Sequence, residues 1–370
     1  MTNRRSLPPI EPPGRSITPI ATRHYRDVPL RALVEAKGDQ VVSVCIPAHD
    51  EATTVGWVVH RLRHYLVDRL GLVDEVIVID DHSGDDTGRV AAEAGAQVVT
   101  AADVLPEIAG GGGKGEALWR SLHVSKGDIV LWCDADISDF GSRFIIGLLG
   151  PLFTDPAISF VKGFYERPRT GAVGGGRTTE LMARPIISTL FPHLSAIVQP
   201  LSGEFGGRRT LLEQLPFVRG YGVDIGLIID VADAVGVAAM AQVDLGTRVH
   251  RNRDLDDLGP QSLVVLQTAL DRAGVRSANP ATLVRPGHPP LVRGFGELPP
   301  VASLPELMVP GGPLPDPRPA PPGPSGRRSR LRWARARAQA QAQSQAQARS
   351  GASGPGRIGP ADPDPDPLLT

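Results

Sequence analysis

Two aspartates, two positions apart, carry the strongest chemical signal in the sequence. Asp134 and Asp136 directly follow residues 128–133 (DIVLWC), an apolar run that predicts a buried strand. Carboxylates at positions i and i+2 of an extended chain point to the same side. Hard cations such as Mg²⁺ or Mn²⁺ prefer oxygen ligands and usually keep contacts to phosphate. In this position the pair predicts a divalent cation beside a diphosphate, although the same spacing is also common in surface turns.

Polar residues also follow two other predicted strands, at 40–47 (QVVSVCIP) and 75–80 (EVIVID). Ligands bind at the carboxyl ends of the strands in a parallel sheet. After the first strand, backbone groups could hold a base edge and the Glu51 carboxylate could accept from a base or ribose. After the second, Asp80 and Asp81 could accept from the nucleotide, or serve only as turn residues. We therefore expect both loops to bind a nucleotide.

Two glycine-rich loops precede predicted helices. Residues 110–116 (GGGGKGE) lack the spacing of a Walker A loop, so Lys114 is expected to contact a nucleotide or a leaving diphosphate. Residues 174–179 (GGGRTT) offer backbone N–H groups, one guanidinium and two hydroxyls, which suit a phosphate or a carboxylate. The second loop is therefore the expected place for an acidic acceptor; the alternative for both segments is a mobile surface loop.

Two further polar residues are candidates for the same site. His250 ends a predicted strand at 240–250 and lies among arginines in the segment RVHRNR, residues 248–253. An imidazole is a good third metal ligand beside a carboxylate, and the arginines suit a phosphate-rich substrate; a structural histidine is the alternative. Asp224 follows the turn GYGV and opens an apolar helix, where it could accept from sugar hydroxyls or cap the helix.

Strands alternate with helices in the order that predicts an α/β fold with a Rossmann-like, mostly parallel sheet and helices on both faces. Residues 1–38 are polar and rich in proline and arginine, which indicates a flexible N-terminal arm. Residues 299–325 hold eleven prolines in 27 positions, so the Pro/Arg/Gln/Ala-rich tail at 299–370 is expected to be disordered. Its arginines could touch RNA or acidic lipid, or simply be solvated.

Composition narrows the class of protein. The formal net charge is −1, so binding to nucleic acid is not expected. The two cysteines, Cys45 and Cys133, lie in apolar runs and indicate buried thiols in a reducing cytoplasm. The sequence contains no secretory signal and no run of about 18 apolar residues, so no membrane span is expected.

Several long motifs are more specific than the aspartate pair. They are GKGEALWRSL, GGGRTTELMARP, QPLSGE, GYGVDIGLIID and VHRNRDLDDLG, between about residues 41 and 258. With them the chain resembles actinobacterial glucosyl-3-phosphoglycerate synthases, which are retaining glycosyltransferases of the GT-A fold. The resemblance implies transfer of glucose from a nucleoside diphosphate glucose, with UDP-glucose as the expected donor, to the 2-hydroxyl of 3-phosphoglycerate. It also implies Mg²⁺ or Mn²⁺ as the cation and a cytoplasmic homodimer.

The resemblance also implies roles for individual residues, and the change of sequence pattern beyond residue 155 indicates a boundary within the domain. Residues 39–155 would be the nucleotide-sugar-binding half and residues 156–298 the acceptor-binding half of one domain. The expected nucleotide-sugar ligands are Pro47, Ala48, Glu51, Asp81, Lys114 and Asp134. The expected acceptor ligands are Gly176, Arg177, Thr178, Thr179 and Asn252. The expected metal ligands are Asp136 and His250, and the expected catalytic residues are Asp136, Asp224 and Arg248.

Two positions depart from the family pattern. Asp50 stands where asparagine is expected, and Asp224 stands where glutamate is expected. The second change shortens a side chain beside the sugar, so mannosyl transfer from GDP-mannose to the same acceptor is an alternative. A polyprenyl-phosphate glycosyltransferase and a non-catalytic nucleotide-sugar sensor are further alternatives; the first usually has a membrane anchor, and the second does not need an intact metal site.

Overall fold

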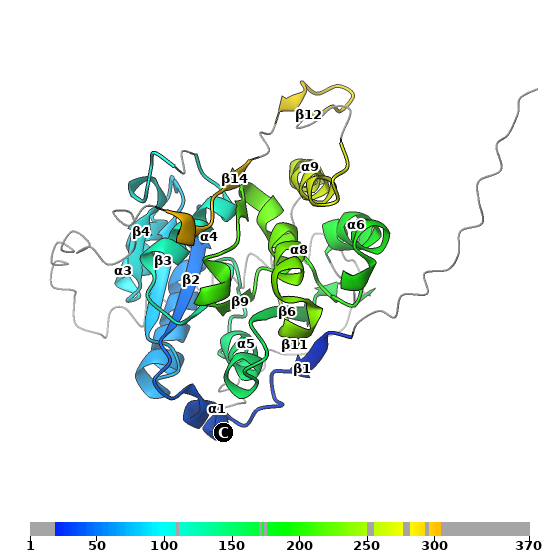
Figure 1. Cartoon of the computed structure of the whole chain (residues 1–370). Helices are drawn as coiled ribbons and strands as arrows, with labels where there is room; N and C mark the ends of the chain where they lie inside the picture. The colour runs from blue at the N-terminus through cyan, green and yellow to red at the C-terminus, as the bar shows by residue number, and fades with distance from the viewer. Residues whose placement is uncertain are drawn as a thin grey trace, which may run out of the picture.

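The computed structural model describes residues 19–108, 111–169, 172–173, 176–249, 255–276, 282–292 and 296–304. Its centre is an eight-stranded sheet in the order β1-β11-β6-β9-β5-β2-β3-β4 (Figure 1). The strands are β1 Ala21–His24, β2 Val42–Ala48, β3 Glu75–Asp80, β4 Gln97–Thr100, β5 Ile129–Trp132, β6 Phe160–Glu166, β9 Phe205–Arg208 and β11 Met240–Thr247. All pairings in the sheet are parallel except those of β9 with β5 and β6. The predicted mostly parallel α/β sheet is confirmed.

Strand β9 was not expected from the sequence, because its two glycines are poor strand formers. Its neighbours explain them. A Cβ atom at Gly206 would lie 2.2 Å from the carbonyl oxygen of Val130, and one at Gly207 would lie 2.3 Å from that of Ser159. The antiparallel strand therefore fits between β5 and β6 only because these positions carry no side chain.

Helices cover both faces of the sheet, as expected. One face carries α1 Leu30–Lys37, α2 Val55–Arg61, α3 Thr87–Glu93 and α5 Arg143–Thr154. The other carries α4 Lys114–Val124, α6 Arg184–Leu190, α8 Val223–Val235 and α9 Leu255–Arg272. Successive strand residues serve opposite faces, so that Val44 and Ile46 join the first core and Cys45 joins the second.

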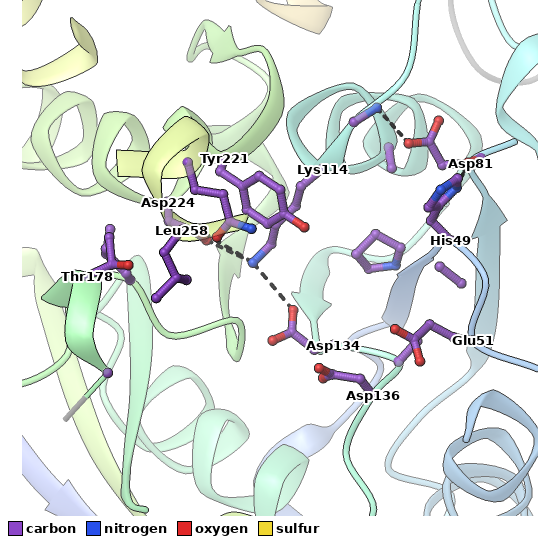
Figure 2. Close-up of a pocket in the computed structure, with 18 of the residues that line it drawn as sticks. His49, Glu51, Asp81, Lys114, Asp134, Asp136, Thr178, Tyr221, Asp224 and Leu258 are labelled. Atoms are coloured by element: carbon purple, nitrogen blue, oxygen red, sulfur yellow. Dashed lines mark hydrogen bonds and ion pairs between the residues drawn. The ribbon is translucent and has the colours of Figure 1, made fainter. Parts of the chain in front are cut away.

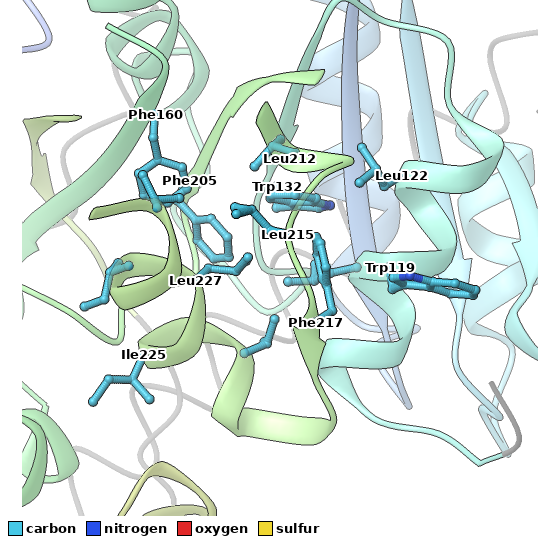
Figure 3. Packing of buried hydrophobic residues seen from close by; sticks show 14 of the residues in the cluster. Trp119, Leu122, Trp132, Phe160, Phe205, Leu212, Leu215, Phe217, Ile225 and Leu227 are labelled. Carbon is cyan, nitrogen blue, oxygen red and sulfur yellow. The ribbon is translucent and has the colours of Figure 1, made fainter. Parts of the chain in front are cut away.

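Aromatic residues fill the core under α4 and α8 (Figure 3). The ring of Trp132 on β5 lies 5.2 Å from that of Phe205 on β9 and 6.0 Å from that of Phe217, measured between centroids. The indole N–H of Trp132 donates to Ser121 Oγ at 2.8 Å, so its buried polar atom is satisfied. Burial of each such ring contributes roughly 1.5–3 kcal/mol, and this packing fixes α4 against the sheet.

The predicted N-terminal arm is wrong for residues 19–38. Strand β1 pairs in parallel with β11, from Ala21 opposite Ala241 to His24 opposite Asp244. Helix α1 buries Leu33 and packs against α5. A four-residue edge strand followed by a short helix gives too few apolar residues for a periodic signal, and residues 1–18 of the predicted arm lie outside the described part of the chain.

The predicted start of the disordered tail at 299 is also wrong. Strand β14 Glu297–Leu298 pairs antiparallel with β10 Phe217–Val218. The indole N–H of Trp119 on α4 donates to the carbonyl of Pro299 at 2.7 Å, and Leu298 and Val301 are buried. We call residues 296–304 the C-terminal clip. The rest of the predicted tail, residues 305–370, lies outside the described residues.

Both cysteines are buried and unpaired, as expected, and burial raises the pKa of Cys45 to about 12. Within the described ranges, none of the helices combines the length and the apolar character needed to cross a bilayer.

Candidate active site

A pocket of about 710 Å³ opens where the strands β2, β3, β5, β6 and β11 reach their carboxyl ends (Figure 2). Of the predicted site residues that the structure describes, all except Asp80 line it. These residues are Pro47, Ala48, Glu51, Asp81, Lys114, Asp134, Asp136, Gly176, Arg177, Thr178, Thr179, Asp224 and Arg248. The predicted ligands His250 and Asn252 lie outside the described residues.

The two aspartates at the carboxyl end of β3, Asp80 and Asp81, make different contacts. Asp81 lines the pocket, and its carboxylate accepts from the backbone N–H of Gly113 at 2.6 Å and contacts His82 Nδ1 at 2.9 Å. Asp80 is absent from the pocket lining, and its carboxylate accepts from the backbone N–H of Ser83 at 3.1 Å. Asp81 thus fastens the glycine loop to the end of β3, whereas Asp80 has the turn contact that was the alternative to nucleotide binding.

Lys114 is the first residue of α4 and lies between two carboxylates. Its ammonium is 3.1 Å from Asp224 and 3.4 Å from Asp134 (Figure 2). Burial opposes the charge of Lys114, but the carboxylates outweigh it and raise its pKa well above the usual value. Gly113 just before it has φ +133°, and a Cβ there would lie 3.2 Å from Gly220 Cα, so only glycine lets the loop deliver Lys114 here.

Arg248 follows β11 and joins four side chains beneath the pocket. Its Nη1 donates to Tyr165 Oη at 2.6 Å and to Glu204 Oε1 at 2.8 Å. Its Nη2 donates to Asp134 at 3.1 Å and to Asp136 at 2.7 Å. Arg248 is only 2% exposed, so these contacts fix the guanidinium and orient both carboxylates.

Opposing effects set the protonation of the carboxyls around Lys114 and Arg248. For Asp134, burial is outweighed by Lys114 and Arg248, which hold its pKa well below the usual value. For Glu204 and Asp224, burial dominates and raises the pKa. Sequence analysis did not select Glu204, although it lies within the motif QPLSGE.

A third buried cation, Lys162, lies below the pocket. Its ammonium donates to the carbonyl of Ser202 at 2.9 Å, and burial lowers its pKa to about 8. The cluster then holds three basic side chains and four carboxyl side chains: Lys114, Lys162, Arg248, Asp134, Asp136, Glu204 and Asp224.

The two aspartates of the D-x-D pair are the accessible oxygen donors of this cluster. Their side chains are 27% and 26% exposed, whereas those of Asp224 and Glu204 are 6% and 0% exposed. Over the residues described, no group of three or more His, Cys, Asp or Glu side chains is arranged to hold a metal ion. Asp134 and Asp136 fit Mg²⁺ or Mn²⁺ as a partial set, because such ions readily take water and diphosphate oxygens as their other ligands.

The pocket is also lined by residues that sequence analysis missed. Arg167 follows β6, Tyr221 lies in the turn before α8, and α9 contributes Leu258, Gln261 and Val265. Arg167 belongs to no recognised motif. Helix α9 contains Pro260, which hides its helical pattern.

Asp50, the first departure from the family pattern, supports a loop. Its φ is +54°, a conformation that aspartate and asparagine both tolerate better than most residues. Its carboxylate accepts from the backbone N–H of Gly84 at 2.7 Å, and it does not line the pocket. The exchange of asparagine for aspartate is therefore compatible with the loop and leaves the pocket wall unchanged.

Comparisons with known proteins agree with this geometry. Residues 43–200 match the model of glycosyl transferase family 2. Glucosyl-3-phosphoglycerate synthase of Mycolicibacterium paratuberculosis is 48% identical over 251 residues, which cover 66% of this chain and 75% of that protein. The enzyme of Petrotoga mobilis is 43% identical over 244 residues, covering 65% and 75% respectively.

Solved structures of the Mycobacterium tuberculosis synthase superpose on the same fold. The complex with Mn²⁺, UDP-glucose and phosphoglyceric acid has a TM-score of 0.71 at 44% identity and covers 77% of this chain and 98% of that chain. The complex with Mg²⁺ and UDP has a TM-score of 0.70 at 43% identity, covering 76% and 98%. With its sheet order, its D-x-D pair and this degree of identity, the chain belongs to the glucosyl-3-phosphoglycerate synthase family.

Proposed function

We propose that the chain transfers glucose from UDP-glucose to the 2-hydroxyl of 3-phosphoglycerate with retention of configuration. The observation that carries the proposal is one pocket in which Lys114 and Arg248 brace the D-x-D pair and which the loop at 176–179 also lines. Relatives with this family's activity and a solved complex with Mn²⁺, UDP-glucose and phosphoglyceric acid support the choice of donor, acceptor and cation.

On the donor side, Pro47, Ala48, Glu51 and Asp81 would hold the nucleotide. The D-x-D pair, with His250, would hold Mg²⁺ or Mn²⁺, which offsets charge on the leaving diphosphate when bound. Lys114 lies between Asp134 and Asp224, where its fixed positive charge can stabilise the same developing charge. Asp224 would accept from sugar hydroxyls.

On the acceptor side, Gly176, Arg177, Thr178, Thr179 and Asn252 would bind 3-phosphoglycerate. Binding would hold the 2-hydroxyl beside the anomeric carbon and remove the entropic cost of bringing the two substrates together. We infer front-face attack, in which the leaving diphosphate accepts the hydroxyl proton. A trapped covalent glycosyl adduct on Asp224 would refute this step.

Two alternatives keep specific tests. Asp224 is one methylene shorter than the expected glutamate, so GDP-mannose stays a candidate donor. The sensor alternative would bind a nucleotide sugar without turnover.

The cytoplasmic homodimer and the boundary between donor and acceptor halves near residue 155 stay predictions. Asp224 and Arg248, from the second half, contact Lys114 and Asp134 of the first.

The deciding assay incubates the purified chain with Mg²⁺ and 3-phosphoglycerate and, separately, UDP-glucose, GDP-glucose and GDP-mannose. Free nucleotide and phosphoglycosyl glycerate are then measured. Product from UDP-glucose that disappears with EDTA supports the proposal. Product only from GDP-mannose would change the donor, and donor binding without product from any pair would favour another acceptor or the sensor.

A further inference from the structure

Arg167 lines the pocket next to Arg248 but has a different electrostatic environment. Arg248 forms ion pairs with Glu204, Asp134 and Asp136. None of the ion pairs among the described residues involves Arg167, and its buried Nε has no hydrogen-bond partner there. A half-buried guanidinium without a carboxylate is costly unless an anion completes it.

Tyr165 connects the two arginines. Its hydroxyl oxygen accepts from Arg248 Nη1 at 2.6 Å and from Arg167 Nη2 at 3.0 Å. Both guanidinium carbons lie 5.1 Å from the centroid of the Tyr165 ring. Tyr165 therefore holds Arg167 close to Arg248, which braces the D-x-D carboxylates. This is the end of the pocket where the reaction is expected to take place.

Arg167 also touches the acceptor loop. A Cβ atom at Gly176 would lie 2.7 Å from Arg167 Nη1 and 3.8 Å from Thr179 Oγ1. The absence of a side chain at Gly176 thus leaves room for the guanidinium against the loop. Arg167 lies between the loop at 176–179 and the Arg248 cluster.

The acceptor of the proposed function has two anionic groups. In 3-phosphoglycerate the carboxylate is bonded to the carbon that carries the reacting 2-hydroxyl, whereas the phosphate is one carbon further away. The carboxylate must therefore lie nearer the reacting centre than the phosphate does. A planar guanidinium binds a carboxylate through two parallel hydrogen bonds.

We propose that Arg167 binds the carboxylate of the acceptor, held in place by Tyr165, while the loop at 176–179 binds the phosphate. The inference rests on the proposed function and adds to it the recognition of the second anion. It makes Arg167 the residue that separates 3-phosphoglycerate from phosphorylated alcohols of the same length.

The test compares two ligands that differ in the carboxylate. Binding of 3-phosphoglycerate and of glycerol 3-phosphate is measured by calorimetry with Mg²⁺ and UDP present, for wild type, Arg167→Gln and Arg177→Gln. Arg167→Gln should lower the affinity for 3-phosphoglycerate roughly 10- to 100-fold. It should change the affinity for glycerol 3-phosphate less than about threefold. Arg177→Gln, the matched control, should weaken both ligands.

Equal weakening of both ligands by Arg167→Gln, or no weakening of 3-phosphoglycerate, would overturn the inference. The UDP affinity and the thermal midpoint of each variant report whether the pocket is intact. If Arg167→Gln does not fold, Arg167→Lys takes its place, because it keeps the charge but loses the paired hydrogen bonds. The same comparison of the affinities for 3-phosphoglycerate and glycerol 3-phosphate then decides. Wild type that neither binds nor glucosylates 3-phosphoglycerate would instead refute the proposed function.

Discussion

The two walls of the pocket differ in whether their charged side chains are paired within the protein. The donor wall, around Lys114, Asp134 and Asp136, has its charges paired within the protein, because Lys114 and Arg248 contact carboxylates at 2.7–3.4 Å. The acceptor wall contains Arg167, which has no carboxylate partner in the described part of the chain. The donor wall is therefore organised before substrate binds, whereas the acceptor wall is completed by its ligand. Substitutions at the donor wall should accordingly affect chemistry, stability or donor binding, and substitutions at the acceptor wall should affect acceptor binding.

The largest effect is expected from removing a charge at the donor wall. Asp136→Asn should lower the rate of product formation by about 10³-fold or more, because it removes an oxygen ligand for the cation and a partner of Arg248. Initial rates are measured over a range of Mg²⁺ and Mn²⁺ concentrations.

The control is Asp155→Asn, which removes a carboxylate from a turn outside the pocket and should leave the rate unchanged. An Asp136→Asn variant that keeps more than about a tenth of wild-type activity would show that the D-x-D pair is not central to catalysis.

The second prediction concerns the C-terminal clip, which packs against α4 and the turn before α8. Arg219 donates its backbone N–H to the carbonyl of Gly296 at 2.9 Å, and its side chain reaches Glu116 on α4 at 3.3 Å. A chain ending at residue 295 loses the burial of Leu298 and Val301 and should be less stable by about 3–5 kcal/mol. Urea unfolding measures the change.

A chain ending at residue 304 is the matched control and should unfold like the full chain. Equal free energies of unfolding for the two truncated chains would mean that the C-terminal clip does not stabilise the fold.

Lys162 offers a pH test of the donor side. Its folded pKa of about 8 is below the usual 10.5, so the unfolded chain binds more protons between these values and the destabilisation by Lys162 fades as pH rises from 8 to 10.5. Lys162→Met should therefore raise stability by about 2–3 kcal/mol at pH 7.

That gain should disappear toward pH 10.5 when variant and wild type are compared by chemical unfolding at each pH. A gain that is independent of pH would mean that the methionine acts through packing and that the ammonium is not strained by burial.

The smallest expected effect concerns the glycine loop. Asp81→Asn keeps an oxygen for the Gly113 N–H but removes its charge, so the KM for UDP-glucose should rise about fivefold to tenfold while the KM for 3-phosphoglycerate stays the same. Steady-state kinetics with each substrate varied in turn separate the two constants. Asp80→Asn, next in sequence but bonded to a turn, should change neither KM; a rise in the acceptor KM with Asp81→Asn would contradict the division into two walls.

Sequence patterns were informative where residue type and position after a strand coincide. Asp134, Asp136 and Asp81 follow apolar runs and line the pocket as expected. The patterns failed where tertiary contacts decide. Strand β9 depends on the close approach of β5 and β6 to two glycines, and α9 contains a proline. Arg167 lies in no motif, and only the folded chain brings it to Tyr165 and Gly176.

The C-terminal clip also sets an order for biosynthesis. The carbonyl that Trp119 binds belongs to Pro299, 180 residues later in the chain. At roughly 5–20 residues per second, a ribosome needs about 10 to 40 s to make that stretch. During this interval strands β2 to β5 can already pair, but the indole of Trp119 and the side of α4 beneath the clip stay uncovered. We therefore expect chaperones to bind nascent chains that already contain α4 but do not yet contain Pro299.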